Sequence, residues 1–307
     1  MSVAYISHPA CLQHEMGMHH PEQPARLSAI QDRLVASGLD MVLLHYDAPA
    51  ATEEQLLMAH TRSYIDQVKS VSPQQGHVWL DGDTAMNPHT LDAALHAAGA
   101  VVHGVDLVMA GAVKQAFCGV RPPGHHAERA VSMGFCIFNN IAIGAKHALR
   151  RHGLERVAIV DFDGPHGNGT EDIVAGDPGI LFCSTFQHPF YPHSGYDSKA
   201  PNVVNMPLPS GTTGSEFREA VYTSWLPRLR EFAPQLLLIS AGFDAHQADD
   251  MASLNLIDDD YFWVTRQLCQ VADECADGRI VSALEGGYDL HALARSVEAH
   301  IKAFYGD

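Results

Sequence analysis

The sequence of 307 residues carries 19 Lys and Arg against 36 Asp and Glu, for a formal net charge of −17, and 46% of its residues are hydrophobic. This composition excludes global disorder, and the acid excess argues against a nucleic-acid-binding protein, which needs a basic face for phosphate. The six cysteines form no Cys-x-x-Cys pair, no apolar run approaches the roughly 20 residues of a membrane span, and the N-terminus does not resemble a signal peptide. We therefore expect a cytoplasmic protein without membrane or nucleic-acid partners.

Short apolar runs alternate with longer helical patterns along the chain. The runs expected to form strands are Val3–Ser7, Ala116–Val120, Val157–Asp163, Ile180–Phe186, Leu236–Ser240 and Ile280–Leu284. The segments expected to form helices are Thr90–Gly111, Asn139–Arg151, Gly214–Arg230 and Asp259–Ala276. The runs are continuously apolar, which is typical of strands buried on both faces of a parallel sheet. No linker or repeat divides residues 1–307, so the pattern predicts one α/β domain of three layers, with a central, mainly parallel sheet.

Polar residues with catalytic chemistry follow most of the expected strands. In chain order they are His125 with His126, Asp161 with Asp163, Ser184 with Thr185, Asp244, and Tyr288. Open α/β sheets bind their ligands at the carboxyl ends of the strands. The sequence therefore predicts an active site at this edge of the sheet.

The aspartates of this edge favour a metal. In an extended backbone, Asp161 and Asp163 project to the same side, and two adjacent carboxylates repel unless a cation or a shared proton lies between them. A turn or helix-capping pair is the alternative interpretation, and a lone Asp such as Asp244 is more often an N-cap than a ligand. Because all three follow strands of one sheet, we favour metal binding.

The histidine pair and the tyrosine suggest proton transfer. His125 and His126 follow the stiff turn Pro122–Gly124, which would fix where both imidazoles point, and two histidines in a cleft can serve as general base and acid. Tyr288 follows two glycines, which let the backbone approach a ligand closely. Taken alone, a His-His pair is more often a surface accident, and Gly-Gly-Tyr is more often a turn.

Taken together, these motifs resemble the histone deacetylase family, including the bacterial histone-deacetylase-like amidohydrolases and acetylpolyamine amidohydrolases. The resemblance covers essentially the whole chain, and the segments that carry it are His20–Leu27, His60–Tyr64, Arg121–Ala127, Gly134–Asn140, Asp161–Gly169, Ser240–Asp244 and Leu284–Tyr288. Arg121–His126 and Leu284–Tyr288 are similar to the class II branch. The resemblance implies an arginase/deacetylase-like fold and zinc-dependent hydrolysis of an acyl-amine amide, of the acetyl-lysine or acetylpolyamine type.

The resemblance also implies roles for individual residues. It makes Asp163 and Asp244 zinc ligands. It pairs His125 with Asp161, and it makes His126, supported by Asn168, the general acid and base. It makes Tyr288 the donor to the oxyanion. A substrate tunnel would be formed by Phe135, Tyr191, Gly134 and Gly287. A structural potassium ion would be held by Asp161, Asp163, Pro165, Ser184 and Thr185. Arg26 would lie near the channel by which the carboxylate product leaves.

One position departs from the family pattern, which has a zinc-binding His where Pro165 stands. A proline side chain has no lone pair to donate. His166 is a conceivable substitute, but it lies three residues after Asp163, so in an extended backbone it points to the opposite face unless a bulge turns it round. We therefore expect a zinc-dependent hydrolase whose activity is impaired, and the alternative is a non-catalytic protein that binds acyl-lysine or polyamines. The sequence leaves the acyl group, the amine and the oligomeric state open.

Overall fold

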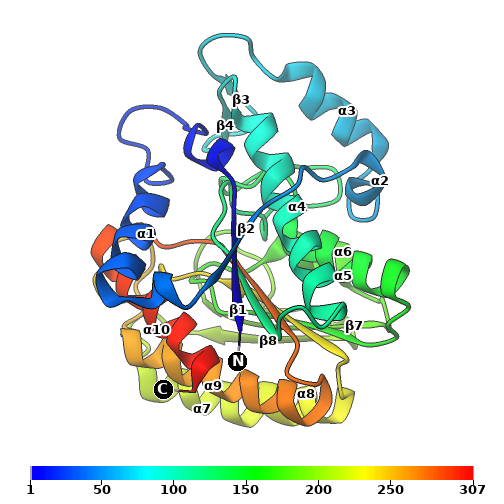
Figure 1. Ribbon diagram of the computed structural model, residues 1–307, viewed down its shortest axis with the longest axis vertical. Coiled ribbons are helices and arrows are strands. Elements are labelled where there is room, and N and C mark those ends of the chain that lie inside the picture. Colours follow the sequence, from blue (N-terminus) through cyan, green and yellow to red (C-terminus); the bar gives the residue numbers. More distant parts are fainter. Residues whose placement is uncertain (1, 307) are drawn as a thin grey trace.

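Within residues 2–306, which the computed structural model describes, eight strands form one parallel sheet (Figure 1). The strand order is β2-β1-β5-β10-β9-β6-β7-β8, and every neighbouring pair is parallel. The strands are β1 (Val3–Ser7), β2 (Leu44–Asp47), β5 (Gln115–Cys118), β6 (Val157–Asp161), β7 (Ile180–Gln187), β8 (Val203–Leu208), β9 (Leu236–Ala241) and β10 (Ile280–Leu284). A separate antiparallel pair is formed by β3 (Val78–Trp79) and β4 (Ala85–Met86). The expected α/β class is confirmed, and the main sheet is entirely parallel.

Helices cover both faces of this sheet (Figure 1). On one face, α4 (Thr90–Met109) packs on β1, β5 and β10, while α5 (Asn140–His152) packs on β6 and β9. On the other face, α10 (Leu290–Tyr305) packs between α1 (Ala25–Ser37) and α9 (Asp258–Cys275). The shorter helical segments are η1 (Pro9–Leu12), η2 (Leu39–Met41), α2 (Glu53–Leu56), α3 (Arg62–Val71), α6 (Asn168–Val174), α7 (Gly214–Ala220), η3 (Val221–Trp225) and α8 (Leu226–Phe232). The three-layer arrangement is as the sequence predicts.

The expected helix Gly214–Arg230 is interrupted in the structure. It is built from α7, a π-helical turn in η3, and α8. Pro227 lies in the first turn of α8 and has no N–H with which to continue an α-helical ladder. The wider π turn absorbs this break, and the chain continues in nearly the same direction.

Helix α4 is the one helix, among those in the described chain, that is long and apolar enough to cross a membrane by length and composition. The expectation of no such segment was therefore too strict. Of its most apolar stretch, 61% is buried inside the protein, against the sheet. That is the ordinary situation of a helix in the core of an α/β fold.

The strand order decides which loops meet. β5, β10, β9 and β6 are neighbours at the centre of the sheet, although they are far apart in sequence. Because all four are parallel, their carboxyl ends lie at one edge. The segments that follow them carry the two histidines, Tyr288, Asp244 and Asp163, so the topology brings all of these residues to one place.

Candidate active site

Two buried carboxylates lie at the centre of this edge. β6 ends at Asp161, and Asp163 lies beyond the strand, just before a bend at Gly164 and Pro165, so its position does not depend on strand alternation. The backbone N–H of Gly286 donates to Asp163 Oδ2 at 2.8 Å, and the N–H of Gly164 donates to Asp244 Oδ1 at 2.8 Å. A Cβ atom at residue 286 would lie 2.6 Å from Asp244 Oδ2 and 2.7 Å from Asp163 Oδ2. The two carboxylates therefore converge on one point that only glycine leaves open.

Burial and nearby negative charge disfavour the ionised forms of this pair. Burial raises the pKa of Asp163 well above its usual range, and the neighbouring Asp244 raises it further. Burial, with the negative charge of Asp249, raises the pKa of Asp244 to about 6. A cation or a proton between the two carboxylates would relieve the repulsion.

The two histidines have opposite electrostatic environments. His125 Nδ1 lies 2.9 Å from Asp161 Oδ2, and its Nε2 lies 3.5 Å from Asp163 Oδ1. Burial opposes the charged imidazolium of His125, but Asp163 and Asp161 outweigh it and raise the pKa of His125 well above its usual range. Burial and the charge of His125 lower the pKa of His126 well below its usual range. Opposite pKa shifts of this kind suit a charged His125 beside a neutral His126 that can act as general base.

The protonation pattern of His126 follows from its partners. Asn168 Nδ2 donates to Glu128 Oε1 at 2.8 Å, which leaves Asn168 Oδ1 to accept from His126 Nδ1 at 2.7 Å. A neutral imidazole with its hydrogen on Nδ1 has its lone pair on Nε2. His126 Nε2 is therefore the atom that can take up a proton.

Glu285 supports both histidines, and the sequence interpretation assigned it no role. Its carboxylate accepts the backbone N–H groups of Gly124 and His125, at 2.7 and 3.1 Å, and the Ser240 hydroxyl at 3.0 Å. The motif Leu284–Tyr288 contains this residue, so the signal was present in the sequence. Its partners are backbone groups distant in the chain, and no spacing rule identifies those.

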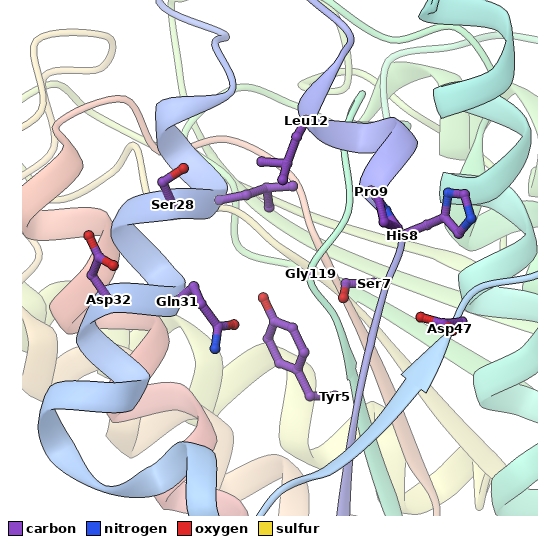
Figure 2. A pocket seen from close by; sticks show the side chains of 11 residues that line it. Tyr5, Ser7, His8, Pro9, Leu12, Ser28, Gln31, Asp32, Asp47 and Gly119 are labelled. Atoms are coloured by element: carbon purple, nitrogen blue, oxygen red, sulfur yellow. The ribbon is translucent and has the colours of Figure 1, made fainter.

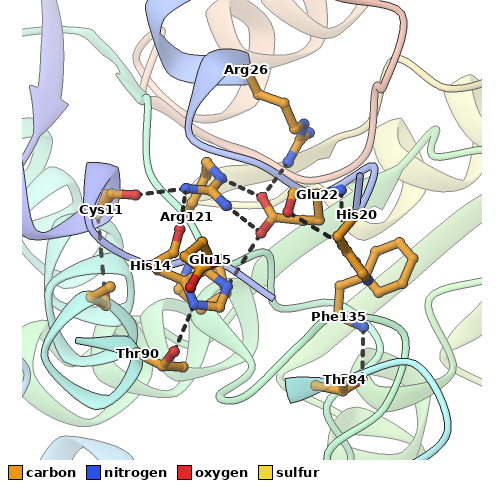
Figure 3. A network of polar contacts seen from close by, with 12 residues as sticks. Cys11, His14, Glu15, His20, Glu22, Arg26, Thr84, Thr90, Arg121 and Phe135 are labelled. Carbon is orange, nitrogen blue, oxygen red and sulfur yellow. Dashed lines mark hydrogen bonds and ion pairs between the residues drawn. The ribbon is translucent and has the colours of Figure 1, made fainter. Parts of the chain in front are cut away.

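A buried ionic network joins Glu22, Arg26 and Arg121 (Figure 3), and its Arg26 reaches the Tyr288 loop. The Arg26 guanidinium lies 4.9 Å from the centre of the Tyr288 ring and donates to the carbonyls of Gly287 and Glu285. Glu22 pairs with Arg26 at 3.0 Å and also accepts from Arg121, and all three side chains are fully buried. Burial alone would raise the pKa of Glu22, but Arg121, His14 and Arg26 hold it well below its usual range. The structure thus places Arg26 behind the tyrosine and its loop.

The expected tunnel residues lie against the expected catalytic ones. The rings of Phe135 and Tyr288 are 5.8 Å apart, and those of Tyr191 and His126 are 5.2 Å apart, both edge to face. Gly134 has φ +56°, and a Cβ there would come within 2.3 Å of the His126 ring. Gly287 has φ +121°, and a Cβ there would meet Leu293 instead. The tunnel itself stays a prediction.

The segment at the departure from the family pattern runs through a bend. Pro165 is buried and offers no donor. His166 is turned to other partners: its Nδ1 lies 3.0 Å from Ser194 Oγ, its Nε2 lies 2.9 Å from Glu171 Oε2, and its ring packs on Phe186. Because both nitrogens are occupied there, the geometry does not support His166 as a substitute ligand. Among residues 2–306, no third His, Cys, Asp or Glu forms a metal-binding group with Asp163 and Asp244.

The residues expected at a potassium site lie beside the same strand end. Asp161 and Ser184 are paired across β6 and β7, and Thr185 follows. The Ser184 hydroxyl is buried without a hydrogen-bond partner in the described part of the chain, while Asp161 Oδ1 accepts the N–H of Asp163 at 3.0 Å. An orphaned buried hydroxyl next to a carboxylate fits a hard cation, which takes oxygen ligands.

Two cavities lie near this edge without containing the histidine pair. One, of about 370 Å³, is lined by residues of β1, η1 and α1 with Asp47 and Gly119 (Figure 2). The other, of about 280 Å³, is lined by Tyr288, Asp249, Asp250 and Asp289, with Met251, Ala248 and Pro21. Three of its lining residues are aspartates, a composition that suits a cationic ligand.

The model of the histone deacetylase domain matches residues 20–304. The chain belongs to the histone deacetylase family. The resemblance read from the sequence is thereby confirmed, and so is the class of activity that the family carries, a deacetylase or amidohydrolase.

Relatives within the family span archaea, bacteria and eukaryotes. The chain is 41% identical to an uncharacterized protein of Synechocystis, with 98% of each chain covered, and 36% identical to a probable deacetylase of Archaeoglobus fulgidus, over 94% of this chain and 82% of that one. It is 37% identical to the polyamine deacetylase HDAC10 of Mus musculus, where it spans 93% of its own length and 45% of the relative. The crystal structure of the HDA15 HD domain superposes with a TM-score of 0.93 at 32% identity, over all of this chain and 88% of that one.

Proposed function

We propose that this chain binds small acylated amines at the Asp163–Asp244 edge but hydrolyses them poorly, because Pro165 leaves the metal site without its nitrogen ligand. The observation that carries the proposal is the donor set: two converging carboxylates, a proline, and a His166 whose ring is turned to Ser194 and Glu171. The alternative is a protein that binds acylated amines and has no hydrolytic role.

The residues present do not fit a catalytic zinc ion. Catalytic zinc sites have three protein ligands, almost always with nitrogen or sulfur among them. Asp163 and Asp244 supply oxygen only, and each already accepts a backbone N–H on one of its oxygens. Affinity for zinc should therefore be low, and we derive no chemical step through a metal for this chain.

The remaining groups keep an arrangement that can bind an amide. His126 Nε2 is free to take up a proton, and Tyr288 is poised by Arg26 to donate from its phenol. Phe135 and Tyr191 lie against these two residues and would pack on the methylene stem of an acylated amine, whose apolar surface leaves water favourably.

A potassium ion fits better than zinc. Asp161 and the unpartnered hydroxyl of Ser184 would hold it, with backbone oxygens of the Asp163–Pro165 segment and Thr185 nearby. Its charge would offset part of the negative charge that surrounds His125. The groups that would hold this ion do not depend on which side chain residue 165 carries.

The acidic cleft beside Tyr288 favours an amine that is itself cationic. Asp249, Asp250 and Asp289 line it, and the chain as a whole carries a net charge of −17. Polyamines carry several ammonium groups at neutral pH, so an acetylated polyamine is the substrate class that we favour over acetyl-lysine in a protein.

The test compares the unmodified protein with Pro165→His and with the matched control Pro165→Ala. Pro165→His should raise zinc content by one equivalent per chain over both others and should produce turnover of an acetylated diamine. Pro165→Ala removes the ring without adding a donor, so it should do neither. Gly164 is best left unchanged, because a Cβ there would lie 2.9 Å from Ala252 Cβ and 3.0 Å from Asp244 Oδ1.

Two results would count against the proposal. Ordinary turnover by the unmodified protein would mean that a donor other than residue 165 completes the site. A Pro165→His protein that gains zinc, binds the acetylated diamine and stays inert would favour the non-hydrolytic alternative.

A further inference from the structure

A second cluster of metal-binding side chains lies between α4 and α5, away from the active site. Asp106 Oδ1 is 2.7 Å from His147 Nε2 and 2.7 Å from His152 Nε2. One ligand atom from each of the three residues lies within 4.8 Å of the other two. Among residues 2–306, no other group of His, Cys, Asp and Glu side chains meets this condition.

The cluster and the active site lie at opposite edges of the sheet. α4 leads into β5 and α5 leads into β6, so the C-terminal ends of both helices lie near the amino ends of these strands. Asp106 is in the last turn of α4, and His152 is the last residue of α5. The catalytic loops follow the carboxyl ends of the same strands. The cluster is therefore no part of the Asp163–Asp244 site.

We propose that Asp106, His147 and His152 form a binding site for a transition metal ion, with zinc as its preferred ion, that ties the C-terminal end of α4 to that of α5. The set of two imidazoles and one carboxylate supplies the nitrogen that the active site lacks. Zinc accepts such ligands in tetrahedral geometry, with water in the fourth position.

The geometry needs little adjustment. Ligand atoms around a tetrahedral zinc ion lie about 3.3 Å apart, since each is about 2.0–2.1 Å from the metal. The two Asp106 contacts of 2.7 Å must therefore lengthen by about 0.6 Å. The Asp106 side chain is 46% exposed and can rotate, whereas His147 is 7% exposed and holds its place. Water reaches the cluster past Asp106 and His152, which is 23% exposed.

The local charges select the class of metal. The C-terminal ends of two helices favour a cation, because their unpaired carbonyl groups carry partial negative charge. Arg150 and Arg151 oppose it, since they line the neighbouring cleft of about 470 Å³ together with His147 and Glu54. Affinity must then come from coordinate bonds rather than from excess negative charge. This excludes Ca²⁺ and Mg²⁺, which need several oxygen ligands, and favours the ions that imidazole binds well.

The experiment titrates the metal-stripped protein with Zn²⁺ by calorimetry and measures its melting temperature with and without one equivalent of the ion. We expect one equivalent to bind and to raise the melting temperature, because only the folded state holds the three ligands together and so binds zinc more tightly than the unfolded chain does. Asp106→Asn and His152→Gln should each weaken this binding at least tenfold. A double variant, Asp163→Asn with Asp244→Asn, should leave it unchanged.

Each outcome of this experiment either supports the proposed site or overturns it. Loss of the bound equivalent in the Asp163–Asp244 double variant, with no loss in His152→Gln, would assign the ion to the active site and overturn the proposal. If the unmodified protein binds no more zinc than His152→Gln does, the cluster holds no metal. Asp106 then only accepts hydrogen bonds from the two histidines. If Asp106→Asn lowers the stability of the metal-free protein, zinc binding is judged from His152→Gln instead, because His152 lies at the end of its helix, where a substitution disturbs the fold less. None of these results depends on Pro165, so this site can fail while the proposed function stands, and the reverse.

Discussion

His300 makes the stability of this fold sensitive to acid. The side chain is fully buried in α10, and its surroundings are the rings of Phe117, Phe162, Phe243 and Phe304. Thr265 donates its hydroxyl hydrogen to the Tyr261 carbonyl, so its oxygen accepts from His300 Nδ1 at 2.6 Å. His300 Nε2, 2.8 Å from the Ser282 hydroxyl, is then the acceptor of a neutral imidazole. Burial lowers the pKa of His300 from 6.5 to about 3.

The direction and size of the effect follow from proton linkage. Between pH 6.5 and pH 3, the unfolded chain holds a proton on this residue and the folded chain does not, so stability falls as the pH falls. Each pH unit in that window costs about 1.4 kcal/mol. Between pH 7 and pH 5, His300 alone should therefore remove about 2 kcal/mol from the free energy of unfolding.

The assay is urea unfolding at pH 7 and at pH 5 for the unmodified protein and for His300→Gln, whose amide can keep both hydrogen bonds without charging. Between pH 7 and pH 5, the free energy of unfolding of the variant should fall by about 2 kcal/mol less than that of the unmodified protein. His291→Gln, an exposed change on the same helix, is the control and should lose as much as the unmodified protein. Equal losses in His300→Gln and the unmodified protein would refute the reasoning.

Two further predictions concern the active site, and both use the Pro165→His background so that turnover can be measured. Tyr288→Phe should leave zinc content unchanged and lower turnover by about 10²–10³, the usual cost of losing one oxyanion donor; equal turnover would remove Tyr288 from the mechanism. Gly286→Ala should remove the zinc ion from the active site and return the zinc content to that of Pro165→Ala, because its Cβ would lie 2.6 Å from Asp244 and 2.7 Å from Asp163. An alanine variant that keeps this extra equivalent of zinc would show that the carboxylates do not converge as described.

The strands that sequence reasoning found and those that it missed differ in burial. The six expected strands include the four at the centre of the sheet, where both faces are covered and all residues except Gln115 and Asp161 are apolar or small. The two missed strands of the main sheet, β2 and β8, are its edges. β2 reads Leu-His-Tyr-Asp and is largely exposed, and β8 is only half-buried. Edge strands need no continuous apolar run, so hydrophobicity could not reveal them.

The site was predictable as a set of residues but not as a set of contacts. Parallel strands bring the loops after β5, β6, β9 and β10 to one edge, and this follows from the alternation of strands and helices alone. The strand order, which makes these four neighbours, does not follow from it. For the same reason Glu285 and Glu22 escaped notice, since their partners lie far along the chain.

The orientation of His166 follows from its contacts rather than from strand alternation. Alternation predicted that this side chain faces away from Asp163, yet β6 ends at Asp161 and the chain bends at Gly164 and Pro165, so alternation does not apply there. Glu171 and Ser194 hold the ring instead, and a Cβ at Gly195 would lie 2.6 Å from His166 Nε2. These contacts fix the ring and occupy both of its nitrogens.

Under the proposed function, residue 165 accounts for the missing nitrogen ligand of the active site. The carboxylates still converge over Gly286, and His126 still has its lone pair directed by Asn168. A site that had lost its ligand-binding role would have no physical reason to keep two buried carboxylates, whose mutual repulsion raises the pKa of Asp163 and costs stability. The arrangement is thus one that a single nitrogen donor at residue 165 would complete. For that reason one substitution, with alanine as its control, can separate an impaired hydrolase from a protein that only binds.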